Sequence, residues 1–384
     1  MKCLLVMPRW SEQGVLLPAS GRPCLDLTLE CLGITSLSVM ELDEDHPFDP
    51  ADVPERYKVI LVQDCGGGSR LRRSLLSTMG LSLGLGAEES DHLKVLGTRT
   101  LTDKHGKAIG FAVERRGRLV AYFRQSIWAG RTSLLKLLRG FVGGQPSGGR
   151  RPRETVCWMV ECAGEPLKLG EYLVNETYSH CRIHHLSTGD AGVVIPALMG
   201  TEFKHRIHEQ LGNRIYALAP TPLEEIVAEQ LIESGLTVTT AESCTTGLIA
   251  ARLSALPGAS AYLMEGVVTY SNSSKQRLLQ VEEELLKSRG AVSREVALAM
   301  AQGALAAGGT DLAVAVTGIA GPDGGSADKP VGTVHLAVCH RNGQTLEHRG
   351  FYRGSRERIR WQASQTALHL LRRMVGFQGE EQGR

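Results

Sequence analysis

The 384-residue sequence lacks a long apolar run, a dominant sign of charge and a paired-cysteine motif. No stretch reaches the 18 or so apolar residues that a membrane-spanning helix needs, and the N-terminal apolar run is too short for a signal peptide. Lys and Arg number 43 against 41 Asp and Glu, which leaves a net charge of +2 and indicates no dedicated nucleic-acid or membrane surface. The 9 cysteines are scattered without a C-x-x-C pair. This pattern is typical of reduced thiols, so we expect a cytoplasmic protein that contacts no membrane.

The composition is that of a globular protein, with 42% hydrophobic and 22% charged residues. The length predicts two or three domains. Residues 143–153, rich in Gly, Pro and Arg, read as a linker. Further along, Thr221 is expected to be the N-cap of a helix, with Pro222 at its first position, Glu224 closing a capping box and Gly235 ending it.

These boundaries predict a multidomain α/β protein. The expected parts are an α/β domain at 1–145, a small α+β domain at 154–217 and an α/β sandwich at 221–378. In the first part, residues 1–7 and 57–62 look like strands, and a glycine run at 66–68 follows the second. The run could receive a phosphate, but without a G-x-G-x-x-G or Walker spacing we interpret it as a tight turn.

The middle part is rich in histidine, which raises a zinc hypothesis. The residues concerned are His180, His184, His185, His205 and His208, with Cys181 among them. No other Cys and no carboxylate stands at a recognisable ligand spacing, so we favour ordinary surface and core histidines and expect no metal.

The third part contains a strand–turn–helix pattern around Ser243. Residues 236–240 form a β-rich run, A-E-S-C-T-T-G follows at 241–247, and a helical pattern comes next. A serine near a helix N-terminus lies where free N–H groups favour developing negative charge, as a nucleophile requires. Serine is also a common helix N-cap, and the pattern is not the G-x-S-x-G elbow, so both interpretations stay open.

A second cluster, V-V-T-Y-S-N-S-S-K at 267–275, predicts a strand that ends at Tyr270 and a helix capped by Ser271 or Asn272. Lys275 then falls in the first helical turn, where the dipole lowers the pKa of a lysine. A neutral lysine can act as a general base, so Ser243 and Lys275 could form a catalytic dyad. The alternative is an ordinary surface lysine.

A third cluster starts at the buried-strand pattern of residues 311–316 and runs into a loop with four glycines at 318–325. Backbone can approach a ligand closely in such a loop at the carboxyl edge of a sheet. The last helix opens near Arg356, and an arginine gains little from the dipole of a helix N-terminus. Its position therefore indicates an anionic ligand.

Taken in order, five motifs resemble the C-terminal domain of the CinA (competence-damage-inducible) family over residues 222–373. They are A-E-S-C-T (241–245), V-T-Y-S-N (268–272) with Lys275, G-A-V-S (290–293), T-G-I-A-G-P-D-G-G (317–325) and K-P-V-G-T (329–333). The resemblance implies a nicotinamide mononucleotide deamidase that needs no metal or organic cofactor. It makes Ser243 the nucleophile and Lys275 its base. The residues that it assigns to substrate binding are Tyr270, Thr245, Thr317, Gly318, Gly321 and Arg356.

The chain departs from this family pattern at two positions. Thr246 replaces the first glycine of E-S-C-T-G-G, and Ser355 replaces the acid of G-D-R. The resemblance implies a small-molecule pyridine nucleotide as partner, and we expect a homo-oligomer. The alternative is a non-catalytic nucleotide sensor or interaction protein linked to competence or recombination.

The front part bears a fainter likeness to the molybdopterin-binding-like domain of the same family, which is associated with ADP-ribose pyrophosphatase activity. Gly97 and Thr98, with residues 110–114, look like a remnant of its V-G-T-A-P-G-F segment. The paired acids expected after the phosphate loop are missing, and a metal-assisted pyrophosphatase needs such carboxylates. We therefore expect a degenerate domain without that activity.

Overall fold

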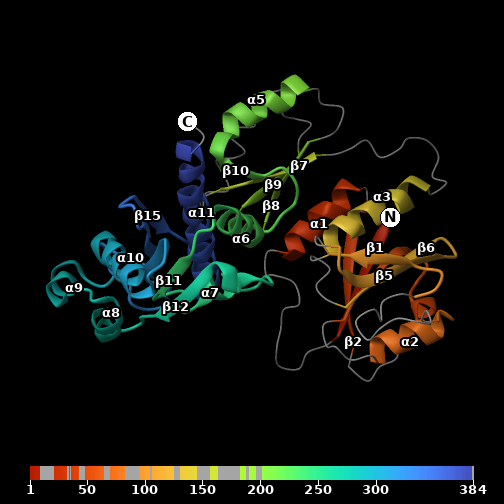
Figure 1. Ribbon diagram of the computed structural model, residues 1–384, viewed down its shortest axis with the longest axis horizontal. Coiled ribbons are helices and arrows are strands. Elements are labelled where there is room, and N and C mark those ends of the chain that lie inside the picture. Colours follow the sequence, from red (N-terminus) through yellow and green to blue (C-terminus); the bar gives the residue numbers. More distant parts are fainter. Residues whose placement is uncertain are drawn as a thin grey trace. The chain divides into compact units, whose positions relative to one another are not determined.

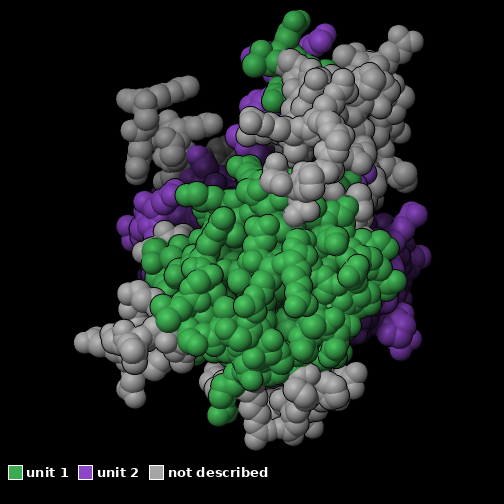
Figure 2. Space-filling view, turned by 90° about the vertical axis from the view of Figure 1, so that its right-hand side faces the viewer, with its two compact units in different colours: residues 1–157, 194–204 green, residues 158–193, 205–384 purple. Residues whose placement is uncertain are grey.

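The computed structural model describes residues 1–8, 21–32, 34, 36–42, 48–64, 70–82, 95–103, 106–124, 130–144, 156–162, 182–186, 190–195 and 201–382. Residues 1–157 with 194–204 form one compact unit, and residues 158–193 with 205–384 form another (Figure 2). Helices combine with three sheets, which confirms the expected multidomain α/β class (Figure 1). The unit boundary passes through the segment 154–217, and the glycine run at 66–68 and residues 145–153 of the expected linker lie outside the described residues.

The first unit contains a six-stranded sheet in the order β2-β1-β3-β6-β5-β4. Four strands pair in parallel, namely β1 (Lys2–Pro8), β2 (Ser36–Leu42), β3 (Tyr57–Gln63) and β6 (Arg118–Phe123), and β5 (Ala108–Arg115) pairs antiparallel with both β6 and β4 (Arg99–Thr102). Helices α1 (Gly21–Cys31) and α3 (Arg131–Gly144) pack in one apolar core, and α2 (Arg70–Thr78) in another. The strands predicted at 1–7 and 57–62 are confirmed.

A four-stranded sheet follows, in the order β10-β7-β9-β8. Its strands are β7 (Val156–Val160), β8 (Arg182–His185), β9 (Ala191–Ile195) and β10 (Ile215–Ala217), with α5 (Thr201–Leu211) before the last. His208 on α5 lies edge-on to Trp158, and His205 pairs with Glu209 four residues on. His180 and Cys181 lie outside the described residues.

The C-terminal domain contains a five-stranded sheet in the order β12-β11-β13-β14-β15. Strands β12 (Leu263–Val268), β11 (Val238–Glu242) and β13 (Leu312–Gly318) are parallel, and β14 (Thr333–His340) pairs antiparallel with both β13 and β15 (Thr345–Phe351). Helix α10 (Arg294–Gly308) packs on the sheet and also contacts α8 (Asn272–Leu279) and α9 (Glu283–Arg289). Helix α11 (Arg356–Gln382) packs on β13 to β15 together with α6 (Leu223–Ser234) and α7 (Leu248–Leu253), which completes three layers (Figure 1).

Two local predictions for this domain are wrong. Helix α6 has Pro222 as its N-cap and no side-chain cap, because the carboxylate of Glu224 instead accepts a hydrogen bond from Nε of Arg252 at 2.7 Å. The strand expected at 236–240 lies at Val238–Glu242. Thr237, just before it, donates its backbone N–H and its hydroxyl to the carboxylate of Asp311. The helix end at Gly235, which adopts a left-handed conformation, is confirmed.

A network of buried polar groups lines one side of α11. Asp190 contacts Nε2 of His369 at 3.0 Å and accepts a hydrogen bond from Gln365, whose amide oxygen accepts one from Arg252. Glu161 pairs with Arg372 and Arg373. Buried ions must be paired to be tolerated, so this helix depends on carboxylates supplied by residues far earlier in the chain.

Of the helices in the described part of the chain, none combines the length and the apolarity needed to cross a bilayer.

Candidate active site

The carboxyl ends of three parallel strands meet at one edge of the C-terminal sheet. Ser243 follows β11, Thr269 follows β12 and Gly318 ends β13. The backbone N–H of Ser243 donates to the carbonyl of Val316 at 3.0 Å, and that of Thr269 donates to the carbonyl of Glu242 at 2.7 Å. Side chains that are distant in sequence are thereby held together at the sheet edge where α/β proteins bind ligands.

Ser243 starts the turn between β11 and α7, and Glu242 before it anchors that turn. The Glu242 carboxylate is fully buried and accepts hydrogen bonds from the backbone N–H groups of Ile249 at 3.1 Å and Ala250 at 2.9 Å. It thus satisfies donors in the first turn of α7 that would otherwise lack partners. Because these N–H groups are occupied, they are not available to a substrate.

Lys275 lies in the first turn of α8, as predicted. The N-cap is Ser271, whose hydroxyl forms a capping box with Ser274. The lysine side chain is 1% exposed, and its Nζ lies 3.1 Å from Oγ of Ser243, 2.7 Å from the carbonyl of Thr269 and 3.4 Å from the carbonyl of Tyr270. The structure therefore brings Ser243 and Lys275 into hydrogen-bond contact.

These contacts suit both protonation states of Lys275. The ammonium ion has three N–H donors for three oxygen atoms. The neutral amine has two, which the two carbonyls can accept, and its lone pair can then accept the proton of the Ser243 hydroxyl. Burial removes water from the ammonium and lowers the pKa of Lys275 below its usual value.

Cys244 is next to Ser243 but is not suited to attack a substrate. Its side chain is buried, and this burial raises the pKa of the thiol to about 12. The thiol therefore stays protonated at neutral pH, and only a thiolate is strongly nucleophilic. Ser243 is the better candidate nucleophile in this turn.

Arg356, Tyr270 and Gly321 come together at the outer margin of the site. The guanidinium of Arg356 donates to the carbonyl of Gly321 at 2.7 Å and to the hydroxyl of Tyr270 at 3.3 Å. The Tyr270 side chain is 61% exposed. Beside the Ser243–Lys275 pair, the cation could bind an anionic group of a ligand and the exposed aromatic ring could stack on an aromatic one.

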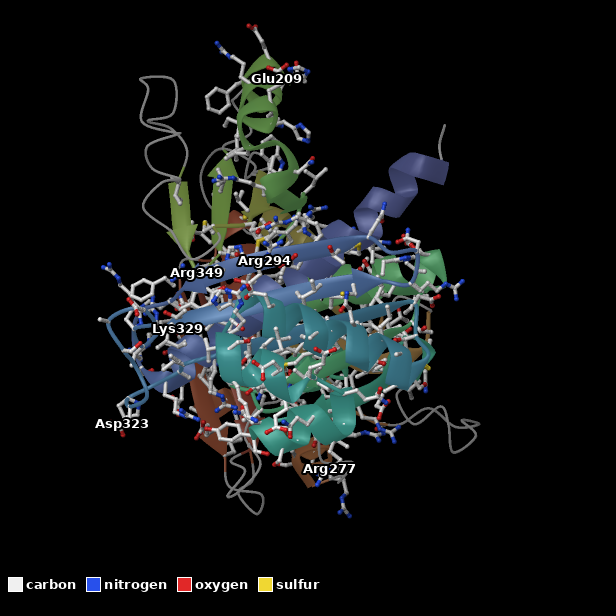
Figure 3. The ribbon with its side chains drawn as sticks, turned by 90° about the vertical axis from the view of Figure 1, so that its left-hand side faces the viewer. Glu209, Arg277, Arg294, Asp323, Lys329 and Arg349 are labelled. Carbon is white, nitrogen blue, oxygen red and sulfur yellow. The ribbon has the colours of Figure 1, made fainter. Side chains whose placement is uncertain are left out.

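The glycine loop after β13 is held close to its neighbours. Gly321 has a φ of +76°, and a Cβ there would lie 2.6 Å from a methyl carbon of Val331. At Gly318 a Cβ would lie 2.9 Å from the carbonyl oxygen of Thr333. Larger residues would thus displace backbone at this edge. Asp323 and Lys329 lie further along the same loop (Figure 3).

The two threonines that the resemblance assigned to substrate binding have different surroundings. The Thr317 hydroxyl donates to the carbonyl of Ala291 at 2.8 Å, so it ties β13 to the segment before α10. The Thr245 hydroxyl is buried and has no hydrogen-bond partner among the described residues. A buried hydroxyl without a partner is costly, which makes Thr245 the more available of the two for a ligand or a water molecule.

Two residues of this site, Glu242 and Arg360, were not predicted from the sequence. One nitrogen of Arg360, from α11, donates to the carbonyl of Thr245 at 2.9 Å and to the hydroxyl of Thr246. The signal for Arg360 was its spacing, because a residue four positions after Arg356 lies on the same helix face. Glu242 gave no comparable signal, since the strand was expected to end at Thr240.

No group of three or more His, Cys, Asp or Glu side chains among the described residues could hold a metal ion.

Comparison with known proteins places the C-terminal part in a family. Residues 220–375 match the model described as the CinA C-terminal domain. A CinA-like protein of Geobacter sulfurreducens is 52% identical over 169 residues, which cover 44% of this chain and 41% of that protein. One of Geotalea uraniireducens is 45% identical over 187 residues, 49% of this chain and 44% of that protein.

Among solved structures, competence/damage inducible protein CihA from Agrobacterium tumefaciens is 48% identical, with 41% of this chain and 97% of that chain covered and a TM-score of 0.39. The chain thus matches less than half the length of the curated relatives. Residues 220–375 are a CinA C-terminal domain.

Proposed function

We propose that the C-terminal domain is an amidohydrolase that converts nicotinamide mononucleotide into nicotinate mononucleotide and ammonia. The observation that carries the proposal is the 3.1 Å contact between Nζ of the buried Lys275 and Oγ of Ser243. A nucleophile within hydrogen-bond reach of a base whose pKa is lowered is the arrangement that covalent amide hydrolysis requires.

In the first step Oγ of Ser243 attacks the carboxamide carbon of the substrate while neutral Lys275 accepts the hydroxyl proton. The tetrahedral intermediate then collapses, the new ammonium of Lys275 protonates the leaving nitrogen, and ammonia departs. A water molecule attacks the resulting ester, again giving a proton to Lys275, which returns it to Ser243 as the product acid leaves. Because Lys275 keeps its oxygen neighbours in both protonation states, it can serve every step.

The developing oxyanion needs hydrogen-bond donors in the turn itself. Glu242 already occupies the N–H groups of Ile249 and Ala250. Within the described residues, the backbone N–H groups of Cys244 and Thr245 donate to no backbone carbonyl. We assign the oxyanion to these two groups, since fixed backbone donors stabilise such charge strongly.

The margin of the site supports this substrate class. Arg356 offers a cation for the 5′-phosphate, and the exposed ring of Tyr270 offers a surface for the nucleotide. We propose a small pyridine nucleotide as the only ligand that this domain requires, without a metal or organic cofactor.

The deciding experiment measures ammonia release from nicotinamide mononucleotide by the full chain and by Ser243→Ala. Turnover by the parent and its loss in the variant are the expected result. Ser254→Ala, which changes an exposed serine on the same chain segment, should retain activity. Tight binding of the nucleotide by the parent without any product would instead favour the nucleotide-sensor alternative.

For the front part of the chain we propose a molybdopterin-binding-like domain that has lost pyrophosphatase activity. What supports this is the doubly wound sheet together with the missing acid pair in the sequence. ADP-ribose incubated with the full chain and Mg²⁺ should stay intact.

A further inference from the structure

Thr246 adopts an unusual backbone conformation in the turn that carries Ser243. Its φ is +51°, in the left-handed region, and Gly247 after it has a φ of +89°. A β-branched residue is disfavoured there and persists only where neighbouring groups hold it. Thr246 is three positions after Ser243, and its N–H donates to the carbonyl of Ser243 at 3.3 Å.

The group that holds Thr246 is Arg360. One guanidinium nitrogen donates both to the carbonyl of Thr245, at 2.9 Å, and to the hydroxyl of Thr246. The two acceptors flank one peptide bond, so Arg360 holds the orientation of that peptide plane together with the backbone N–H of Leu248, which donates to the same Thr245 carbonyl at 3.3 Å. Arg360 is on α11, which packs against the sheet and α6, so the clamp ties the turn to a rigid element.

The orientation of the peptide between Thr245 and Thr246 matters for the chemistry. With the Thr245 carbonyl turned toward Arg360, the N–H groups of Cys244 and Thr245 donate to no backbone carbonyl among the described residues. If this peptide rotated, the preceding N–H groups would lose their alignment. Misplacement of reacting groups by about 1 Å can reduce a rate by roughly 100-fold.

We propose that Arg360 and the hydroxyl of Thr246 form a positioning clamp that keeps the oxyanion donors and Ser243 aligned. This inference rests on the proposed function, because it assigns those residues a role in the same reaction. This role requires no contact of either residue with the substrate. Their contribution should appear in kcat and leave KM almost unchanged, since the alignment matters most in the transition state.

The test compares Thr246→Val with Thr246→Ser in the full chain. Valine keeps the branched shape and removes the hydroxyl, whereas serine keeps the hydroxyl. We expect Thr246→Val to lower kcat about three- to tenfold with KM within about twofold, and Thr246→Ser to restore kcat. Arg360→Lys should lower kcat by a similar factor, and adding it to Thr246→Val should cost little more, because both changes disable the same clamp.

A second readout does not depend on turnover. A sulfonyl fluoride should label Ser243 in the parent, with Ser243→Ala as the blank, and Thr246→Val should slow the labelling while Thr246→Ser does not. Equal kcat and equal labelling in Thr246→Val overturn the clamp and leave the proposed function standing. The clamp is also overturned if Thr246→Ser lowers kcat as much as Thr246→Val does. It is overturned too if the loss of kcat in Thr246→Val is matched by a lower labelled end-point, because that would indicate damaged protein. If the parent protein neither releases ammonia nor is labelled at Ser243, both the proposed function and the clamp are wrong.

Discussion

The Nζ of Lys275 lies 2.7 Å from the carbonyl oxygen of Thr269. This carbonyl is at the end of β12, and Lys275 is in the first turn of the helix that follows, so the chain anchors the lysine to its own backbone six residues earlier. Anchored in this way, the amine can hold a fixed direction toward Ser243 without help from a substrate. The dyad should therefore be assembled in the free protein.

The first prediction separates the basic role of Lys275 from its charge. Lys275→Arg keeps a cation, but arginine cannot give up its proton under ordinary conditions. We expect kcat for ammonia release to fall by roughly 100-fold or more, the range that a general base supplies. Lys287→Arg, on the exposed face of α9, is the matched control. If Lys275→Arg stayed active, the lysine would only position the substrate, and Tyr270 would be the next candidate for the base.

The second prediction concerns pH. Neutral Lys275 is the active form, so kcat/KM should rise with pH as the ammonium loses its proton. Burial lowers the pKa of Lys275, so the midpoint of this rise should lie below the value of about 10.4 for a lysine in water. Initial rates across a pH series measure it. A midpoint that moved in Tyr270→Phe, or a rate independent of pH, would speak against Lys275 as the base.

The third prediction addresses Glu242. Glu242→Gln replaces one carboxylate oxygen by an NH2 group, which cannot accept the N–H of Ile249 or Ala250. A buried donor then lacks its partner, and we expect unfolding free energy to fall by about 1–2 kcal/mol. Urea denaturation of the full chain measures the loss. Glu265→Gln on the exposed part of β12 should change nothing, and equal effects of the two variants would refute the anchoring role.

The fourth prediction concerns Asp190. Burial raises its pKa, but the charge of His369 and the hydrogen bonds from His369 and Gln365 outweigh burial and leave the pKa below its usual value. The contribution of a carboxylate with a lowered folded-state pKa is present above about pH 4 and is lost as pH falls through that folded-state value. Asp190→Asn should therefore be less stable at pH 7, by about 3 kcal/mol, and approach the parent under acid conditions.

The other charged groups facing this cluster are Glu161, Arg372 and Arg373. They are common to both proteins, so the difference between parent and variant isolates Asp190. Asp323→Asn, in the exposed glycine loop, serves as the control (Figure 3). A stability difference that stayed constant down to pH 3 would contradict the assignment.

Sequence patterns predicted the elements of the C-terminal domain better than the details of their ends. The strand predicted at 311–316 and the cap predicted at Ser271 or Asn272 are encoded by a short apolar run and a capping residue, which act locally. The predicted capping box at Thr221 failed because Glu224 has a stronger partner, Arg252, that is distant in sequence. A local pattern cannot register such competition.

In the site, too, some features could be predicted from the sequence and others could not. Ser243 could be singled out because it lies between a strand and a helix, and Lys275 because it lies in the first turn of the helix that follows another strand. The order of the sheet then brings them together. The clamp of Arg360 on Thr246 could not be predicted, because it depends on the distance between α11 and the turn. Thr246 looked in the sequence like a departure from a glycine pattern, and the structure gives it a hydrogen-bonding partner.

The polar side of α11 has a consequence for how this domain can be moved between proteins. The family match begins at residue 220, yet Glu161 and Asp190, which hold Arg373, Arg372 and His369, lie before it. The matched region, residues 220–375, thus leaves out two carboxylates that bind side chains of its last helix. A transplant cut at residue 220 would carry arginines without their counter-ions. Such a graft should either include the earlier carboxylates or replace the matching side chains of α11 with neutral ones.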